Sequence, residues 1–470
     1  MGACCSKNID DFGYEDIEPE EWETDGEDVL GEGDCGAKIR LKGSSSFVSV
    51  FSKQGKKGVN QDALTVWEEF TGEKDVLYCS VFDGHGPSGH EVAHRVRDKL
   101  PSKLSSAIKR SQVKASNIDL MDKDDSEEEE KEEDDGRSGN STNSRDEDST
   151  NSSLLLSSWE ASFIRSFKDM DDDLKNDSTV DCFCSGTTAV SIVRLGDHLM
   201  VANLGDSRAV LCTRGQKNQL VPVQLTVDLK PNIPSEVERI RKCKGRVFAI
   251  EHEPEVFRIW MPDENCPGLA MARAFGDFCL KDYGLISQPD LSYRKIMPSD
   301  EFVVLATDGI WDVLTNNEVI KVVSSVRTRS LAAKVLVARA VRAWRTKYPG
   351  YKIDDCAVIC LFFKEAEPSE QPELNAPKGQ SGQGAPNPPG PAKGKKNVSP
   401  AAGKKEKDNE EWNALEGVTR VNSLIKLPRL SSILHRRKAA KDHGDASETR
   451  SIADETRSIA DEARSISVLQ

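Results

Sequence analysis

The sequence predicts an α+β domain, because strand-like and helix-like segments both occur within residues 38–364. Strands are indicated by short apolar runs, rich in β-branched residues, at 47–51, 187–193, 199–203, 302–306 and 357–361. Helices are indicated by apolar residues at helical spacing in segments 90–104, 154–167, 316–326 and 331–344. We expect Pro101 to interrupt the first of these helices. A third observation, the aspartates at several strand ends, predicts where a functional site lies.

These aspartates stand at one end of three separate strands. One apolar strand leads into Asp83, a second leads into Asp308, and a third begins just after Asp355. A carboxylate at the end of a buried strand costs free energy unless a cation meets it. The pattern therefore suggests one acidic cluster at the rim of a sheet, and oxygen-only ligands of this kind suit Mg²⁺ or Mn²⁺. A single Asp-Gly pair, in contrast, is more often only a turn.

Composition narrows the class of protein. The 470 residues carry a net charge of −15, and the pI of about 5.2 argues against a nucleic-acid partner. The twelve cysteines show neither metal-ligand nor disulfide spacing, and no secretory apolar segment stands at the start. The sequence therefore favours a reducing cytosol. No apolar run approaches the ~18–20 residues that a membrane-spanning helix needs.

Seven short segments, taken together, resemble the metal-dependent type-2C (PPM) serine/threonine protein phosphatases, and in particular the plant members. They follow the family's order and are GVNQDAL (58–64), VFDGHGPSGH (81–90), SGTTAV (185–190), ANLGDSRAVL (202–211), AMARAFGDFCLK (270–281), VLATDGIWDVL (304–314) and DDCAVICL (354–361). The resemblance implies a four-layer α-β-β-α sandwich, in which two antiparallel sheets are flanked by helices. It also implies hydrolysis of phosphoserine and phosphothreonine in proteins. The alternative is a catalytically weak member that acts as a membrane-tethered scaffold or regulatory binding module.

The resemblance further implies which residues hold two Mg²⁺ or Mn²⁺ ions. Asp83 would bridge both ions, and the Gly84 carbonyl, Asp308 and Asp355 would be further ligands. A water activated by the two ions would attack phosphorus directly, without a covalent phosphoenzyme.

Two more carboxylates extend this predicted site. Asp312 follows Asp308 by four residues. Asp206 matches a family position that helps to hold an additional, third ion. The alternative for Asp206 is a turn residue that bonds to backbone amides or to Arg208.

Three other residues are candidates for catalysis. We expect His85 to protonate the leaving oxygen, since the ordinary histidine pKa of about 6.5 suits that role; the alternative is a structural histidine. Asp62 matches an acidic position just outside the ligands. Lys57 falls where animal members place an arginine that grips the substrate phosphate, and the alternative is an ordinary solvated lysine. Arg273 and Asp277 are expected to form a structural ion pair.

The start of the chain carries an acylation signal. Gly2 fits N-myristoylation, and Cys4 and Cys5 are neighbouring palmitoylation candidates. Two acyl chains together would anchor the protein stably, so we expect the cytoplasmic face of the plasma membrane. The alternative is a plain N-terminus on a protein of the cytosol or nucleus.

The chain is expected to divide into three parts. Residues 1–36 are predicted to be an acylated disordered segment, 37–365 the catalytic domain, and 366–470 a low-complexity tail. Within the catalytic domain, an acidic stretch at 111–153 is predicted to be a disordered surface insertion. Within the tail, 421–441 is basic and amphipathic and could lie on an anionic membrane or dock to a partner. We expect a monomer that acts on phosphoproteins.

Overall fold

A computed structural model describes the backbone of residues 28–124 and 146–364, with side chains for 28–112 and 157–364. The acylation candidates Gly2, Cys4 and Cys5, the tail from 366 and its stretch 421–441 lie outside the described residues. In these two ranges, no helix has both the length and the apolar character that crossing a bilayer requires.

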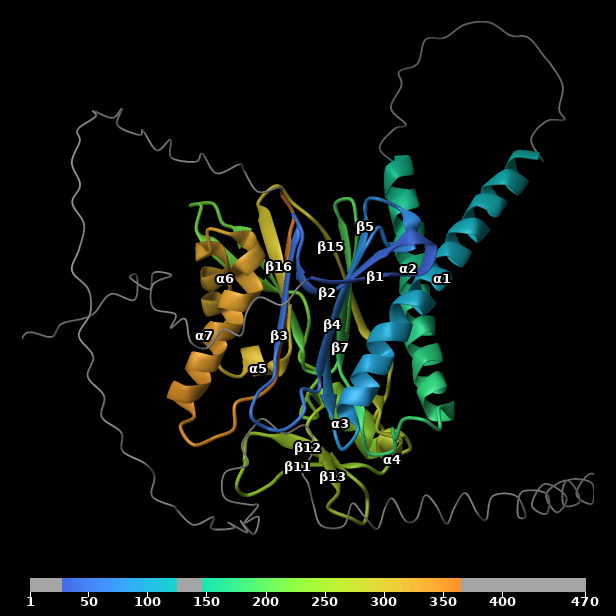
Figure 1. Cartoon of the computed structure of the whole chain (residues 1–470). Coiled ribbons are helices and arrows are strands. Elements are labelled where there is room, and N and C mark those ends of the chain that lie inside the picture. The colour runs from blue at the N-terminus through green and yellow to red at the C-terminus, as the bar shows by residue number, and fades with distance from the viewer. Residues whose placement is uncertain (1–27, 125–145, 365–470) are drawn as a thin grey trace, which may run out of the picture. The chain divides into compact units, whose positions relative to one another are not determined.

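Fourteen strands form one continuous hydrogen-bonded sheet that folds into two layers (Figure 1). One layer contains β1 (Val29–Glu32), β4 (Asp62–Glu68), β5 (Val76–His85), β7 (Ala189–Leu195), β8 (His198–Leu204) and β15 (Asp290–Lys295). The other contains β3 (Val48–Lys53), β9 (Arg208–Arg214), β10 (Leu220–Gln224), β16 (Asp300–Ala306) and β17 (Cys356–Phe362). The strand β2 (Lys38–Ser44) joins the layers, because it pairs with β4 in one and with β3 in the other. These pairings are antiparallel.

Smaller elements attach at one end of the sandwich. The two-residue strands β6 (Gly186–Thr187) and β14 (Phe275–Gly276) extend the edge next to β5. A separate three-stranded sheet consists of β11 (Arg246–Ala249), β12 (Phe257–Trp260) and β13 (Pro267–Leu269). Short helices are α3 (Pro234–Lys242), α4 (Phe278–Lys281), α5 (Asp308–Trp311) and the 3-10 turns Asp34–Gly36, Phe70–Gly72 and Arg329–Leu331.

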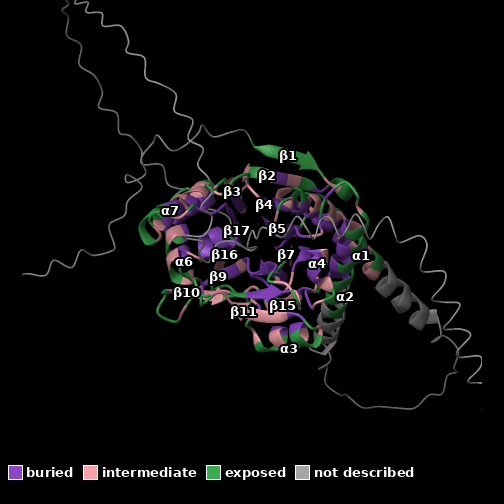
Figure 2. Cartoon of the chain, turned by 90° about the horizontal axis from the view of Figure 1, so that it is seen from below, coloured by how far each residue is buried: buried purple, intermediate pink, exposed green. Residues whose placement is uncertain are grey.

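Helices cover both outer faces of the sandwich. The pair α1 (Gly89–Asp124) and α2 (Asp146–Asn176) covers one sheet, and the pair α6 (Asn316–Ser325) and α7 (Ala332–Lys347) covers the other (Figure 1). The space between the sheets is filled by alternate strand residues such as Val50, Val66, Val81, Leu305 and Ile359, all 4% exposed or less. Figure 2 shows these buried layers end-on. The predicted four-layer α-β-β-α sandwich is therefore confirmed.

The helix α1 contradicts the prediction that Pro101 interrupts it. The helix continues through Pro101 to Asp124, well into the range predicted as an insertion. A proline inside a helix costs ~3 kcal/mol. Four apolar residues on both sides of it are fully buried against the sheet and α2, namely Val96, Leu100, Leu104 and Ile108. Each contributes about 1.5–3 kcal/mol, so their burial outweighs the proline.

Two other boundaries differ from the sequence prediction. The strand β1 begins at Val29, before the expected domain start at residue 37, and all four of its residues are exposed. An edge strand without a buried face leaves no apolar alternation in the sequence. The helix α2 begins at Asp146, eight residues before the expected Leu154. The rest of the predicted insertion, 125–145, lies outside the described residues.

Candidate active site

The predicted carboxylates meet at one edge of the folded sheet. Asp83 lies near the end of β5, and Asp62 is its partner across β4 in the register of the two strands. Asp308 begins α5 directly after β16, and Asp354 and Asp355 directly precede β17. Because β16 and β17 are neighbours, the end of one and the start of the other lie side by side. Strands far apart in sequence therefore bring these side chains together.

The buried carboxylates of the cluster affect one another's ionisation. Burial, and then the charges of Asp308 and Asp62, raise the pKa of Asp83 well above its usual range. Burial followed by Asp354 and Asp206 raises the pKa of Asp308 to about 7. Groups of like charge in a poorly solvated site resist joint ionisation. Such a site favours the binding of cations.

The structure changes the assignment of one predicted ligand. Both carboxylate oxygens of Asp355 accept backbone hydrogen bonds, from the Gly55 amide at 2.7 Å and the Gln61 amide at 2.9 Å. Asp354 instead contributes to the repulsion at Asp83 and Asp308. The sequence offered this residue only as the neighbour in an Asp-Asp pair. The oxygens of Asp354 accept hydrogen bonds from the Lys57 ammonium and, at 3.0 Å, from the Asp355 amide.

Lys57 lies within the cluster, as its candidate role requires. Its Nζ is 2.6 Å from Oδ2 of Asp354. Burial lowers the pKa of Lys57, but Asp354 and Asp308 outweigh this effect and the pKa is raised. Lys57 is therefore a half-buried, charged ammonium held by the cluster and not an ordinary solvated lysine.

Asp206 and Asp312 both act on a second lysine, Lys230. Lys230 places its Nζ 2.6 Å from Oδ2 of Asp206. Burial lowers the pKa of Lys230, yet Asp206 and Asp312 more than compensate and the pKa is raised. Burial and then Asp308 raise the pKa of Asp312 to about 8. Sequence reasoning missed Lys230, which stands alone in a loop without a recognisable pattern.

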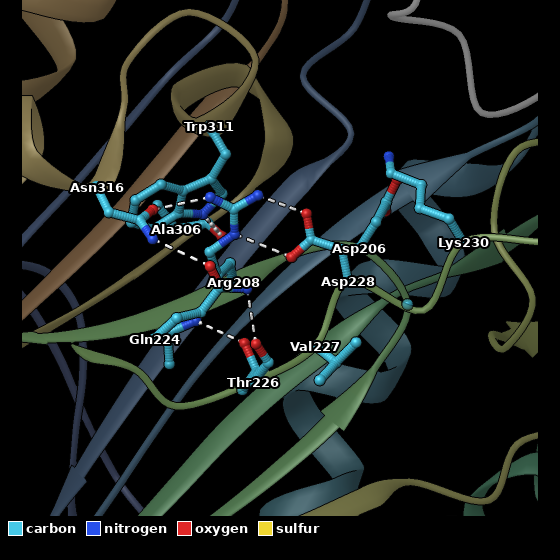
Figure 3. Close-up of polar contacts among 12 residues, drawn as sticks. Asp206, Arg208, Gln224, Thr226, Val227, Asp228, Lys230, Ala306, Trp311 and Asn316 are labelled. Atoms are coloured by element: carbon cyan, nitrogen blue, oxygen red, sulfur yellow. Dashed lines mark hydrogen bonds and ion pairs between the residues drawn. The ribbon is translucent and has the colours of Figure 1, made fainter. Parts of the chain in front are cut away.

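Arg208 does not pair with Asp206, contrary to one of the alternatives. Its Nε donates to Oδ1 of Asp228 at 2.9 Å, and its Nη1 donates to Oδ1 of Asn316 at 2.8 Å (Figure 3). The guanidinium also lies over the Trp311 ring, 5.0 Å from the ring centroid. Arg208 therefore ties the loop after β10 to the segment that carries Asp308 and Asp312.

His85 is buried next to the cluster and has a carboxylate partner. Its Nε2 lies 2.5 Å from Oδ2 of Asp277, and the side chains are 3% and 0% exposed. The remaining ring nitrogen, Nδ1, is buried and has no hydrogen-bond partner among the described atoms. The expected pair of Arg273 with Asp277 is wrong, because Arg273 contacts Glu236 at 2.7 Å instead. Charge pairing alone could not tell which acid folds against which base.

The backbone at Gly84 admits no side chain. A Cβ there would lie 2.4 Å from the Gly89 carbonyl oxygen and 2.6 Å from that of Gln61. Glycine is therefore required by the close approach of two neighbouring segments. The same tight packing holds Gly84 rigidly beside Asp83.

The donor set fits divalent cations that prefer oxygen. One carboxylate oxygen each of Asp83, Asp206 and Asp312 is buried without a hydrogen-bond partner among the described atoms. Over residues 28–124 and 146–364, no three acidic, imidazole or thiol side chains are grouped so as to hold an ion by themselves. Mg²⁺ is usually held by one or two carboxylates and keeps several waters, and carboxylate oxygens are the buried donors present here.

A shallow depression of about 350 Å³ opens beside the cluster. It is lined by Asp312 and by the residues around it, among them Arg208, Trp311, Asn316 and Lys347. A larger one of about 610 Å³ lies along α3. We regard the smaller depression as the approach to the site, because Asp312 both lines this depression and belongs to the carboxylate cluster.

Comparisons with known proteins agree with this arrangement. The family model for protein phosphatase 2C matches residues 136–347. Probable protein phosphatase 2C 73 of Oryza sativa subsp. japonica is 48% identical over 459 residues, which cover 96% of this chain and 100% of that protein. Probable protein phosphatase 2C 33 of Arabidopsis thaliana is 46% identical over 436 residues, covering 83% of this chain and 88% of the relative.

A solved structure, the serine-threonine phosphatase 2C from Toxoplasma gondii, has the same fold. It superposes with a TM-score of 0.57 at 22% identity and covers 72% of this chain and 99% of its own. That likeness bears on the fold, whereas the sequence relatives establish the family. The chain belongs to the protein phosphatase 2C family and is a serine/threonine protein phosphatase.

Proposed function

We propose that this phosphatase hydrolyses phosphoserine and phosphothreonine with two Mg²⁺ or Mn²⁺ ions held by Asp83, Asp308, Asp354 and the Gly84 carbonyl. The observation that carries the proposal is that buried carboxylates from three separate strand ends meet at one edge of the sheet, where they raise one another's pKa. Asp354 takes the place expected for Asp355, whose two oxygens are engaged by backbone amides. Asp206 and Asp312, with one unpartnered oxygen each, are the candidates for a third ion.

The bound ions would stabilise charge on the phosphoryl group and lower the pKa of an attacking water. The residues of the chain supply the rest. Asp62 accepts a hydrogen bond from the Thr307 hydroxyl at 2.7 Å and so joins the strands that bear the ligands. Lys57 presents an ammonium at the cluster that can attract the substrate phosphate. Asp277 orients His85, which donates a proton to the leaving oxygen.

A metal titration with a phosphothreonine peptide tests the proposal. The wild-type protein should release phosphate only with Mg²⁺ or Mn²⁺, and Asp83→Asn should lose about a hundredfold or more in kcat, since one charged partner of the transition state is removed. Asp173→Asn is the matched control, because Asp173 is half exposed on α2 and pairs only with Lys103 among the described contacts. Equal turnover by Asp83→Asn and Asp173→Asn would overturn the site.

We further propose that acylation of Gly2, Cys4 and Cys5 holds the phosphatase at the cytoplasmic face of the plasma membrane, as a monomer. The sequence signal at the start of the chain supports this proposal. Fractionation of cells that express the wild type, Gly2→Ala or Cys4→Ser/Cys5→Ser tests it. We expect membrane association in the wild type only, and retention of the Gly2→Ala protein at the membrane would contradict the acyl anchor.

A further inference from the structure

Asp277 is held beside His85 by its backbone and not by further bonds of its own carboxylate. The side chain is fully buried and Oδ2 contacts His85, whereas Oδ1 has no hydrogen-bond partner among the described atoms. Within the described part of the chain, no second polar group therefore fixes the direction of this carboxylate. The position of Asp277 relative to His85 depends on the backbone turn that carries Asp277.

This turn has an unfavourable backbone conformation. Gly276 and Asp277 have φ angles of 75° and 49°, so two successive residues have a positive φ. Glycine adopts a positive φ readily, whereas an aspartate does so at a cost in free energy. Such a conformation persists only where neighbouring groups enforce it. The contacts of the turn therefore decide where Oδ2 of Asp277 points.

Two hydrogen bonds act directly on the turn. The Asp277 amide donates to the Ser185 carbonyl at 2.9 Å, just before the two-residue strand β6. The Gly276 amide donates to Oδ1 of Asp171 at 2.9 Å, and Asp171 belongs to α2 in the outer helical layer. A side chain from a distant helix thus fixes the residue that precedes Asp277.

Asp171 is itself held firmly in place. It is buried, and its Oδ2 lies 2.7 Å from Nζ of Lys281, which also donates to the Ala274 carbonyl at 2.8 Å. One helical turn earlier on α2, the ring of Phe167 packs on that of Phe275, with 5.1 Å between the ring centroids. Figure 1 shows this end of α2 beside α4, which follows the turn. The helix α2 therefore supports the turn through both an apolar and a polar contact.

The packing around the two side chains leaves little room for adjustment. A Cβ at Gly186 would lie 2.2 Å from Oδ2 of Asp277 and 2.8 Å from Nε2 of His85. The contact between Asp277 and His85 is therefore packed directly on the backbone of β6. Because a close-packed interior transmits a displacement and does not absorb it, a shift of the turn would alter the contact between Asp277 and His85.

We infer that Asp171 is a positioning residue for proton transfer to the leaving oxygen. It does not touch the reacting atoms. Its carboxylate fixes the Gly276 amide, the turn then presents Asp277 to His85, and Asp277 orients the imidazole. The inference rests on the proposed role of His85 as the general acid. Loss of the acceptor at Asp171 should slow the step in which the phosphorus–oxygen bond breaks and the leaving oxygen takes a proton.

The dependence of kcat on the leaving group tests the inference. A threonine oxygen needs a proton as it leaves phosphorus, whereas p-nitrophenolate is a stable anion and leaves without one. With Mn²⁺ present, Asp171→Ala should lower kcat for a phosphothreonine peptide by about tenfold or more, which is part of the roughly 10²–10⁴-fold that a positioned general acid contributes. The KM for the peptide and the kcat for p-nitrophenyl phosphate should stay within about twofold of the wild type, because neither depends on that proton.

Further variants separate the hydrogen bond from other effects of the substitution. Asp171→Asn loses the charge that pairs with Lys281 but keeps an oxygen for the Gly276 amide, so its kcat for the peptide should stay within about threefold of the wild type. Asp173→Ala is the matched control, because Asp173 is half exposed on the same helix and pairs with Lys103; both activities should be unchanged. If Asp171→Ala does not fold, Asp171→Leu fills a similar space without an acceptor and takes its place.

The variant His85→Gln distinguishes failure of this inference from failure of the proposed function. It should lose kcat for the peptide but not for p-nitrophenyl phosphate. If it shows this selective loss and Asp171→Ala does not, the inference alone is overturned. An equal loss on both substrates in Asp171→Ala, or the full selective loss in Asp171→Asn, would also overturn it, because the Gly276 hydrogen bond would not be the cause. If His85→Gln shows no selective loss, the general-acid role of His85 fails and the inference fails with it.

Discussion

The substitution Asp308→Asn should stabilise the metal-free protein, although Asp308 is a proposed metal ligand. Burial and the neighbouring Asp354 and Asp206 raise the pKa of Asp308 from 3.8 to about 7. The folded state therefore disfavours the ionised form of Asp308. This loss of folding stability is absent below pH 3.8, the pKa in the unfolded chain, and complete above about pH 7, the pKa in the folded protein. At pH 8 this shift corresponds to about 4 kcal/mol of lost stability. At pH 5.5 only about 2 kcal/mol is lost.

Thermal unfolding in EDTA measures this effect. Asparagine carries no charge, so we expect the Tm of Asp308→Asn to exceed that of the wild type by on the order of 10 °C at pH 8. At pH 5.5 the difference should be about half as large, because much of the wild-type carboxyl group is already protonated.

Addition of Mn²⁺ should reverse the order. The wild type should gain stability as the ions bind the folded state, whereas Asp308→Asn should gain much less. The reasoning fails if Asp308→Asn melts below the wild type in EDTA at pH 8, or if Mn²⁺ raises both Tm values equally. If the Tm difference between Asp308→Asn and the wild type were the same at pH 5.5 and pH 8, the ionisation of Asp308 could not be its cause.

Three other predictions follow from the same site. Asp354→Asn should weaken Mn²⁺ binding in a calorimetric titration. Asp355→Asn should mainly lower the free energy of unfolding, by about 1–3 kcal/mol, because two half-buried backbone amides lose a charged acceptor. The opposite pattern would restore Asp355 as the ligand. Asp277→Asn should lower kcat and alter the basic limb of the pH–rate profile, while the Mn²⁺ affinity stays unchanged. An unaltered profile would mean that His85, the partner of Asp277, has no catalytic role. Lys230→Met should destabilise the metal-free protein, because it leaves the buried Asp206 carboxylate without its cation. Adding Asp206→Asn should recover most of the lost free energy of unfolding, as measured with urea. Purely additive effects of the two substitutions would show that the two side chains are not coupled.

Much of the fold was readable from the sequence, because its strands are buried on one or both faces. Runs such as 302–306 and 357–361 have no polar interruption, which is the pattern of strands buried on both faces. The extent of the helix α1 could not be predicted in the same way. Pro101 opposes a continuous helix locally, and only the burial of apolar residues on both sides of Pro101 stabilises it. The exposed strand β1 carried no signal for a similar reason.

The sequence by itself determined the chemistry of the site: aspartates at strand ends that are distant along the chain, each next to a glycine or another aspartate. Only the tertiary structure decided which side chains face one another. It gave both oxygens of Asp355 to backbone amides and one oxygen of Asp354 to Lys57, paired His85 with Asp277, and brought Lys230 to Asp206. The physical reason is that the residue type alone gives the charge of an ionisable group, whereas the backbone geometry decides its partner, which in these pairs lies 24 to 297 residues away.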